Sequence, residues 1–266
     1  MFPFNKSINV NGGDIDYISF GKGDKYLIII PGLGDGIKTV RGMYFPYFLK
    51  YKKLASKYKI FIFSRRNNIS NNFTTDDMAL DIINTMDLLN IKSASILGIS
   101  QGGMIVQKIA IKYSSRVDKL ILVVTTSRVN DIVNNRVSKW IKYALNKDYK
   151  SIFLDSIKNS YSNKFLSKYF KYCNIISKFG TFKNLDRFII QARSCLEHNS
   201  YDELGKINVS TLIIGASNDN IVGVDASLEL FNKIVDSELY IYPDYGHAVY
   251  IEAKDFNNRV LEFLNK

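Results

Sequence analysis

The segment ASILGISQGGMIVQKIAIKY (residues 94–113) decides the fold of this chain. It starts as a short apolar strand, turns sharply at the pattern G-x-S-x-G, and continues with the apolar spacing of a helix. In this context the serine between the two glycines, Ser100, is predicted to sit on a strained elbow that exposes its hydroxyl. Gly98 and Gly102 fit that geometry, because side chains there would collide with the neighbouring strand and helix. An ordinary serine in a tight turn is the alternative.

Short apolar runs and helix-like segments alternate on either side of this elbow. Residues 75–90 and 101–113 have helical periodicity, and Asn11-Gly12 is typical of a hairpin turn between two opening antiparallel strands. The apolar runs are typical of strands buried on both faces: YLIII (26–30), IFIFS (60–64), ASILG (94–98), LILVVT (120–125), TLIIG (211–215) and LYIY (239–242). The alternation predicts an α/β fold, with a mostly parallel sheet and helices on both faces.

One interval is too long for a single crossover. About 85 residues separate LILVVT from TLIIG, and most of them read as aromatic-rich helices. We therefore predict a core domain of residues 1–127 and 198–266, with a helical cap inserted at 128–197. Most cap aromatics are expected in a core, although some could line an apolar acyl or aryl pocket. They are Trp140, Tyr143, Phe153, Tyr161, Phe165, Tyr169, Phe170, Tyr172, Phe179 and Phe182.

Composition excludes several classes of protein. With 266 residues and 46% apolar content, the chain can fill a sizeable core, so a disordered or fibrous protein is not expected. The net charge of +11 comes without long basic runs, which favours background composition over a nucleic-acid partner. No apolar stretch approaches the ~18 residues of a membrane span, so we expect a cytoplasmic protein without stable membrane insertion. Cys173 and Cys195 lack metal-ligand spacing and are expected to be buried thiols.

A serine hydroxyl needs a base to become an effective nucleophile, and the chain has two histidines. His247 follows the last predicted strand, and catalytic side chains gather at the carboxyl ends of strands in open α/β sheets. His198 is flanked by polar residues just beyond the predicted cap. His247 is therefore the expected base, with capping of the last helix as its structural alternative.

The imidazole in turn needs an acceptor to orient it. Asp219 follows the strand TLIIG and gives the chain order Ser, Asp, His. Asp225 is the rival, although it resembles the first turn of the next helix, where an acid is favoured by the helix dipole. Asp244 lies three residues from His247 in a segment that suits a turn. We predict that Asp219 is the acceptor.

A tetrahedral intermediate also needs hydrogen-bond donors for its oxyanion. The loop PGLGDG (31–36) follows a predicted strand and offers backbone N–H groups without large side chains. The N–H of Leu33 and the N–H of Gln101, the residue after the nucleophile, are the expected donors. A plain glycine turn is the alternative for this loop.

Three ordered motifs resemble the α/β-hydrolase superfamily over nearly the whole chain outside the cap: GISQGGMIVQKIAIKYSSRVDKLILV, INVSTLIIGASNDNIV and YGHAVYIEAKDFNNRVLEFL. The similarity is to small esterase-like members. The chain departs from it at Pro31, where many members have histidine, at Ser210, where proline is usual, and at Ala216, where glycine is usual. SRRNNIS (64–70) also lacks the glycines common after that strand.

The resemblance implies a serine hydrolase that cleaves an ester or thioester of a small apolar or acyl substrate through an acyl-enzyme, without a cofactor. A carbon–carbon hydrolase of the same fold, and a ligand receptor that retains the three residues, are the alternatives. Residues 128–188 carry 13 Lys/Arg against four Asp and no Glu. These residues would therefore repel a substrate that carries an ammonium group and attract an anionic substrate.

Overall fold

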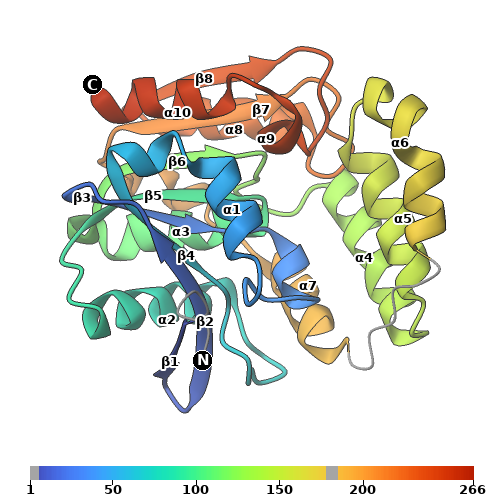
Figure 1. The fold of residues 1–266 in the computed structure, drawn as a ribbon, viewed down its shortest axis with the longest axis horizontal. Coiled ribbons are helices and arrows are strands. Elements are labelled where there is room, and N and C mark those ends of the chain that lie inside the picture. Colours follow the sequence, from blue (N-terminus) through green and yellow to red (C-terminus); the bar gives the residue numbers. More distant parts are fainter. Residues whose placement is uncertain (1–5, 178–184) are drawn as a thin grey trace.

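A computed structural model describes residues 6–177 and 185–266, so Lys178, Phe179, Phe182 and Lys183 of the predicted cap lie outside the described residues. One eight-stranded sheet has the order β1-β2-β4-β3-β5-β6-β7-β8 (Figure 1). β1 pairs with β2, and β2 with β4, in antiparallel fashion, whereas the other neighbours are parallel. The strands are β1 (Lys6–Val10), β2 (Gly13–Phe20), β3 (Lys25–Ile30), β4 (Tyr58–Phe63), β5 (Ala94–Ile99), β6 (Val117–Val123), β7 (Thr211–Ala216) and β8 (Ser237–Tyr242). The predicted mostly parallel sheet is confirmed.

The hairpin between β1 and β2 turns at the predicted dipeptide. Asn11 and Gly12 have φ angles of 50° and 80°, the left-handed values that a two-residue turn of this kind requires. Val10 consequently pairs with Gly13, and the register continues from there to Lys6 and Tyr17.

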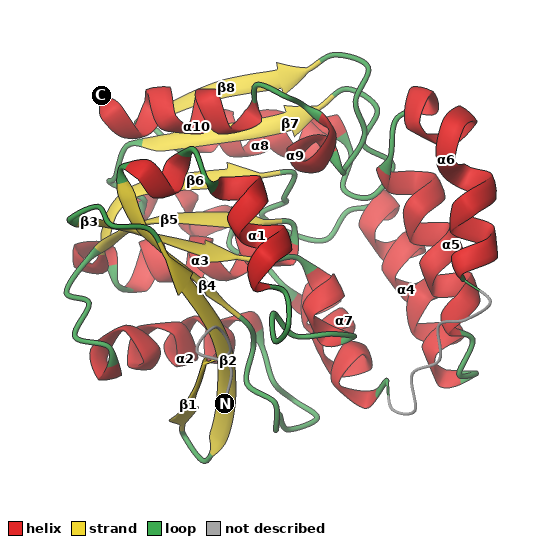
Figure 2. Cartoon of the chain, viewed as in Figure 1, coloured by secondary structure: helices red, strands yellow, loops and turns green. Residues whose placement is uncertain are grey.

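Helices cover both faces of the sheet, as predicted (Figure 2). On β3, Ile28 and Ile30 belong to one apolar cluster, whereas Leu27 and Ile29 belong to the other, because alternate side chains of a strand point to opposite faces. The first cluster includes residues of α2 (Thr75–Leu88), α3 (Gln101–Lys112) and α8 (Val224–Lys233). The second includes residues of α1 (Tyr44–Tyr51), α9 (Val249–Glu252) and α10 (Phe256–Asn265).

In the described part of the chain between β6 and β7, where the sequence predicts an insertion, there are four α-helices: α4 (Asp131–Leu145), α5 (Tyr149–Ser160), α6 (Asn163–Ile176) and α7 (Asp186–Glu197). They lie beyond the carboxyl ends of the parallel strands (Figure 1). Trp140 of α4 and Phe188 of α7 pack in one cluster with Leu33 and Met104 of the sheet domain. Asp155 of α5 accepts a hydrogen bond from Trp140 Nε1 at 2.9 Å, so apolar and polar contacts both hold the helices in place.

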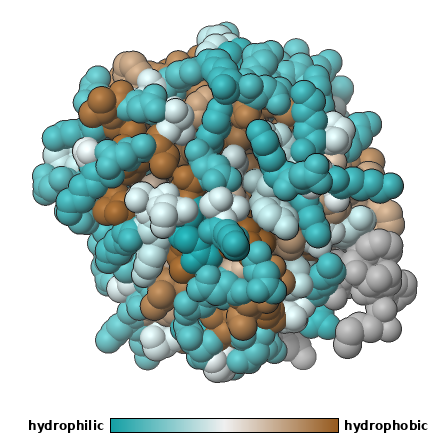
Figure 3. Space-filling view, turned by 90° about the vertical axis from the view of Figure 1, so that its left-hand side faces the viewer, coloured by the Kyte–Doolittle hydropathy of each residue, from teal (hydrophilic) through white to brown (hydrophobic). Residues whose placement is uncertain are grey.

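The described residues also form four short 3-10 helices: η1 (Leu33–Gly36), η2 (Leu54–Ser56), η3 (Ser114–Arg116) and η4 (Tyr201–Lys206). The end of the molecule opposite α4–α6 shows mostly hydrophilic side chains with apolar patches between them (Figure 3). Among the described residues, no helix has the length and hydropathy to cross a membrane. Both cysteines are free; Cys195 is buried as predicted, whereas Cys173 is only half-buried because it lies on α6, whose residues are largely exposed.

We predict that Gly102→Ala lowers the free energy of unfolding by about 1–3 kcal/mol or prevents folding. A Cβ at this position would lie 2.0 Å from the carbonyl oxygen of Ile30, a backbone atom that cannot move aside. The clash outweighs the ~1 kcal/mol that alanine gains over glycine in a helix. Urea denaturation measures the change. Gly205→Ala is the matched control, because nothing lies within 4 Å of that Cβ, and it is expected to be near neutral.

Candidate active site

Ser100 lies on the predicted elbow between β5 and α3. Its φ and ψ are 54° and −120°, a strained conformation for a residue with a side chain. The surrounding hydrogen bonds hold it there: Ser100 N donates to Val123 O at 2.9 Å, and Ser100 O accepts from Thr125 Oγ1 at 2.7 Å and from Gly103 N at 2.8 Å. With the backbone fixed on both sides, the side chain projects into a cavity that it lines.

His247 and Asp219 are brought together from separate loops. His247 Nδ1 lies 2.8 Å from Asp219 Oδ2. The other carboxylate oxygen, Oδ1, accepts from Ile221 N at 2.8 Å and from Val222 N at 3.0 Å. Both side chains are buried, so the carboxylate is oriented by two backbone donors and in turn orients the imidazole.

The rival acids are held elsewhere. Asp225 lies in the first turn of α8, as its sequence context indicates. Asp244 occupies a turn with φ 63°, and its backbone N–H donates to Ser217 Oγ. Neither carboxylate has a hydrogen bond to His247 among the described residues.

His198 is a buried structural histidine in this fold. Its Nδ1 lies 3.0 Å from Thr75 Oγ1, and its Nε2 lies 3.4 Å from Ser200 Oγ. Burial, with a smaller contribution from the Lys108 ammonium, lowers the pKa of His198 to about 3. The imidazole is therefore neutral at physiological pH, and it does not line the cavity at Ser100.

The cavity at Ser100 has a volume of about 370 Å³. Ser100, His247 and the loop after β3 form one side, while Trp140, Ile152 and Phe188 close it from the inserted helices. Among the described cap aromatics proposed from sequence, only Trp140 lines this cavity. Others pack on one another instead, as Tyr161 and Phe165 do with ring centroids 4.1 Å apart. Phe188 was missed, because its place in a helical pattern does not distinguish a pocket from a core.

Two backbone amides have the features expected of oxyanion donors. Leu33 begins η1 in the loop PGLGDG, and Gln101 begins α3 directly after Ser100. Neither N–H donates to a backbone or side-chain acceptor among the described residues. Gly32 places this loop against the elbow, with Ser100 Cβ 3.3 Å from the position of a Cβ on the glycine. The loop therefore contacts the elbow directly.

A buried arginine that was not predicted holds this loop in place by hydrogen bonds. Arg65, 2% exposed, follows β4 and donates from Nη2 to Pro31 O and to Gln101 Oε1, the latter at 2.8 Å. Gln101 Nε2 donates in turn to Gln191 O of α7 at 2.8 Å. The only sequence signal for Arg65 is a charged pair directly after the apolar run IFIFS, in a segment that already departs from the family pattern.

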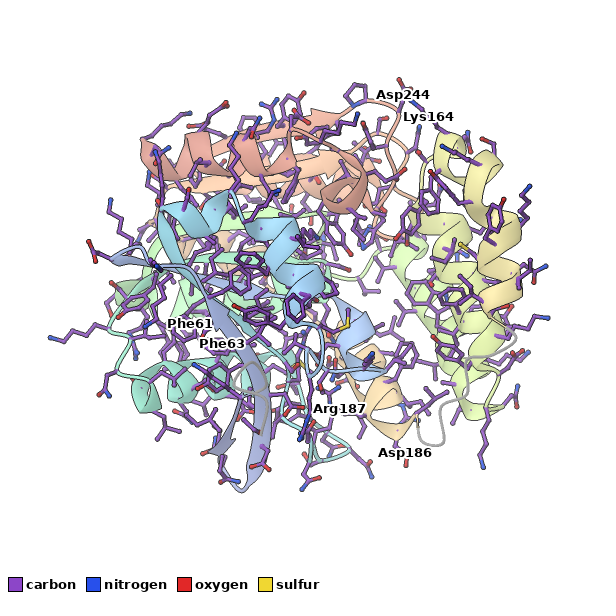
Figure 4. All side chains as sticks on the ribbon, in the orientation of Figure 1. Phe61, Phe63, Lys164, Asp186, Arg187 and Asp244 are labelled. Atoms are coloured by element: carbon purple, nitrogen blue, oxygen red, sulfur yellow. The ribbon has the colours of Figure 1, made fainter. Side chains whose placement is uncertain are left out.

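Asp35 is a second unpredicted link between the loop and α7. Its Oδ2 accepts from Arg65 N at 3.0 Å and from Arg187 Nη2 at 2.5 Å. In Figure 4, Arg187 lies beside Asp186 at the start of α7 and faces the sheet domain, which agrees with its hydrogen bond to Arg65 O. Arg187 therefore contributes to internal pairing rather than to a free cationic surface.

A metal site is not evident in the part of the chain that the structure describes. There, His, Cys, Asp and Glu side chains form no group of three that could hold a metal ion.

Most of the chain matches one known protein family. Residues 25–254 match the family described as alpha/beta hydrolase fold. The chain belongs to the α/β-hydrolase fold family. The superfamily resemblance predicted from three motifs is thus confirmed, and the match extends across the inserted helices.

The α/β hydrolase is similar to several named hydrolases. It is 28% identical over 205 residues to 2-hydroxy-6-oxononadienedioate/2-hydroxy-6-oxononatrienedioate hydrolase of Klebsiella pneumoniae, covering 74% of this chain and 71% of that protein. An enol-lactonase from Burkholderia xenovorans shares the fold with a TM-score of 0.83 and 16% identity, over 98% of this chain and 100% of that one. A meta-cleavage product hydrolase from Pseudomonas fluorescens has a TM-score of 0.79 and 23% identity, over 98% of each chain.

We predict that Arg65→Met lowers the free energy of unfolding by about 2–4 kcal/mol. The substitution leaves Pro31 O and Gln101 Oε1 without their buried donor, and each lost hydrogen bond to a charged group costs about 1.5–3 kcal/mol, partly offset by removing a buried charge. Urea denaturation measures the effect. Arg193→Met on the exposed side of α7 is the matched control and is expected to change stability by less than about 0.5 kcal/mol. Equal effects of the two substitutions would contradict the structural role of Arg65.

Proposed function

We propose that this α/β hydrolase is a serine hydrolase that cleaves a carboxylic ester or thioester through an acyl-enzyme. The observation that carries the proposal is the Asp219–His247 pair at 2.8 Å, whose imidazole lines the same cavity as Ser100. The backbone N–H groups of Leu33 and Gln101, which donate to no acceptor among the described residues, support the proposal further. An acceptor at Nδ1 leaves Nε2 as the nitrogen that can exchange a proton with the serine.

The proposed reaction has two stages. Ser100 Oγ attacks the carbonyl carbon while His247 takes the serine proton, and the resulting oxyanion accepts hydrogen bonds from Leu33 N and Gln101 N. His247 then protonates the leaving group, which departs and leaves the acyl-serine. A water molecule, deprotonated by His247, releases the acid and restores Ser100.

Cavity size and lining favour a small substrate with an apolar arm. The cavity of about 370 Å³ is closed by Trp140, Ile152 and Phe188, which suit an acyl or aryl group. We assign the role of a specificity-determining cap to residues 128–197. In its described part, exposed lysines outnumber acids and would attract an anionic substrate over a cationic one.

Carbon–carbon hydrolysis is the second candidate, and the similar proteins favour it. The compound named for the Klebsiella pneumoniae relative contains a ketone, a hydroxyl and two carboxylates but no ester. Its hydrolysis must therefore break a carbon–carbon bond. A ligand receptor that retains the three residues is the remaining alternative. Parallel assays with 4-nitrophenyl esters and with a 2-hydroxy-6-oxodienoate separate the three functions. An ester hydrolase prefers the esters, a carbon–carbon hydrolase prefers the dienoate, and a receptor turns over neither.

We predict that Ser100→Ala abolishes turnover of the best substrate, and labelling by a fluorophosphonate, with little effect on stability. The substitution removes a hydroxyl from the elbow without opening a core cavity. His247→Ala is expected to be about as damaging, because the members of such a triad act as a unit. His198→Ala is the matched control and should retain most activity in the folded fraction. Loss of activity in His198→Ala, together with retained activity in His247→Ala, would refute the assignment of the base.

We predict that Asp219→Asn lowers kcat on the order of a thousandfold while the fold is kept. The amide would donate toward Nδ1 and favour the wrong imidazole tautomer. Steady-state kinetics measure the loss, with Asp225→Asn and Asp244→Asn as controls of the same chemistry. A loss below tenfold for Asp219→Asn, or a larger one in either control, would transfer the role to another acid.

A further inference from the structure

A second cavity adjoins the one at Ser100 on the side of α1 and α9. It has a volume of about 270 Å³, and both cavities are lined by Pro31, Gly32, Met43, Tyr47 and Tyr250. Water in the liquid occupies about 30 Å³ per molecule, so the second cavity has room for a small charged group with a few methylene groups. It therefore lies where one arm of a molecule bound at Ser100 could extend.

Of the described residues that line this second cavity, only Lys50 is charged, and its charge is not balanced. Nζ lies 4.9 Å from the ring centroid of Tyr51 and 4.2 Å from that of Tyr250, both of which line the cavity. Among the described residues, no carboxylate or hydrogen-bond acceptor pairs with this ammonium. Aromatic faces stabilise a cation by about 0.5–2 kcal/mol, less than an ionic partner in a desolvated site.

Tyr51, which also lines this cavity, has an unsatisfied hydroxyl. Tyr51 is fully buried, and its Oη has no hydrogen-bond partner among the described residues. A buried donor left unpaired costs about 1–3 kcal/mol, so such groups usually have a partner in the functional state. The remaining lining consists of aromatic and apolar side chains and the loop backbone: Ile29, Pro31, Gly32, Met43, Pro46, Tyr47, Ile99, Tyr250 and Ile251.

A carboxylate is the simplest ligand that satisfies both groups. One oxygen can accept from the Lys50 ammonium and the other from Tyr51 Oη, and the charges cancel. A neutral carbonyl would leave the ammonium unbalanced. We infer that the second cavity is a subsite for a carboxylate on the substrate, with Lys50 and Tyr51 as its recognition residues. This inference rests on the proposed function, because it places in the second cavity the end of the substrate that lies away from the carbonyl attacked by Ser100.

The protonation of Lys50 gives the subsite a characteristic pH dependence. Burial lowers the pKa of Lys50 to about 7. The titratable groups that face it are Tyr47 and Tyr51 on α1 and Tyr250 on α9, and burial raises the pKa of each. These tyrosines stay neutral below pH 9, so only Lys50 changes charge there. The ammonium is present below about pH 7 and is lost above it, and the preference for a carboxylate should follow.

Matched esters test the inference. 4-Nitrophenyl hydrogen glutarate and 4-nitrophenyl pentanoate place a carboxylate or a methyl group at the end of the acyl arm. 4-Carboxyphenyl pentanoate and phenyl pentanoate place a carboxylate or a hydrogen at the para position of the leaving group. We expect the ratio of kcat/KM, anionic over neutral, to fall at least tenfold in Lys50→Met for one of these pairs, which identifies the arm that occupies the subsite. In the wild type, that ratio should decline as the pH rises through about 7, and in Lys50→Met it should be flat.

Lys52→Met is the matched control, because it removes an exposed lysine just beyond the end of the same helix. If it lowers the ratio as much as Lys50→Met does, general electrostatic attraction explains the preference and the subsite is refuted. An unchanged ratio for both pairs in Lys50→Met refutes it as well. Tyr51→Phe removes only the hydroxyl and should lower the same ratio less than Lys50→Met, without loss of folding.

Binding without turnover separates this inference from the proposed function. Glutarate, and not its uncharged analogue glutaramide, should raise the melting temperature of the wild type, and Lys50→Met should abolish the increase. If this binding is seen while no ester is cleaved and Ser100 is not labelled by a fluorophosphonate, the proposed function fails and the carboxylate site stands. If esters are cleaved but glutarate gives no shift that depends on Lys50, the subsite fails alone.

Discussion

The candidate site depends on one close backbone approach, in which the first turn of α3 lies directly beneath the end of β3. Gly102 has no side chain, so the carbonyl of Ile30 can pass over it. That approach places the loop after β3 beside Ser100, where the backbone is held in a left-handed conformation by hydrogen bonds to Val123 and Thr125. The strain at the elbow is thereby balanced by contacts in the sheet around it. Any side chain at residue 102 would separate the loop from the elbow.

Buried polar groups connect this loop to the inserted helices. Asp35 in the loop accepts from Arg187 on α7, and Gln101 after the elbow is held between Arg65 and α7. Charges in a desolvated setting have strict geometric demands, so these contacts define where α7 lies on the sheet domain. The apolar cluster of Trp140, Phe188 and Leu33 closes the same boundary. The helices therefore form one wall of the cavity at Ser100.

Much of this architecture could be read from local pattern. Apolar runs predicted every strand of the parallel part to within about three residues, because strands buried on both faces leave little choice of residue type. Ser100, Asp219 and His247 could each be named, since each follows a strand and so lies at the same edge of the sheet. Arg65, Asp35 and Lys50 could not be singled out. Their partners lie on other loops and helices, and a charged residue near a strand end or on a helix carries no local sign that it will be buried.

The kind of fold, the order of its elements and the identity of the residues at the elbow follow from sequence, because backbone periodicity and glycine sterics act between near neighbours. Tertiary structure decided the rest. It buried His198 between Thr75 and Ser200 while bringing His247 to Asp219. Among the described residues, it placed Trp140 and Phe188 at the cavity and packed other aromatics of the inserted helices, such as Tyr161 and Phe165, on one another. It also placed the Lys50 ammonium between two tyrosine rings. Burial and pairing of polar groups are properties of several distant segments at once, so they arise only when those segments pack together.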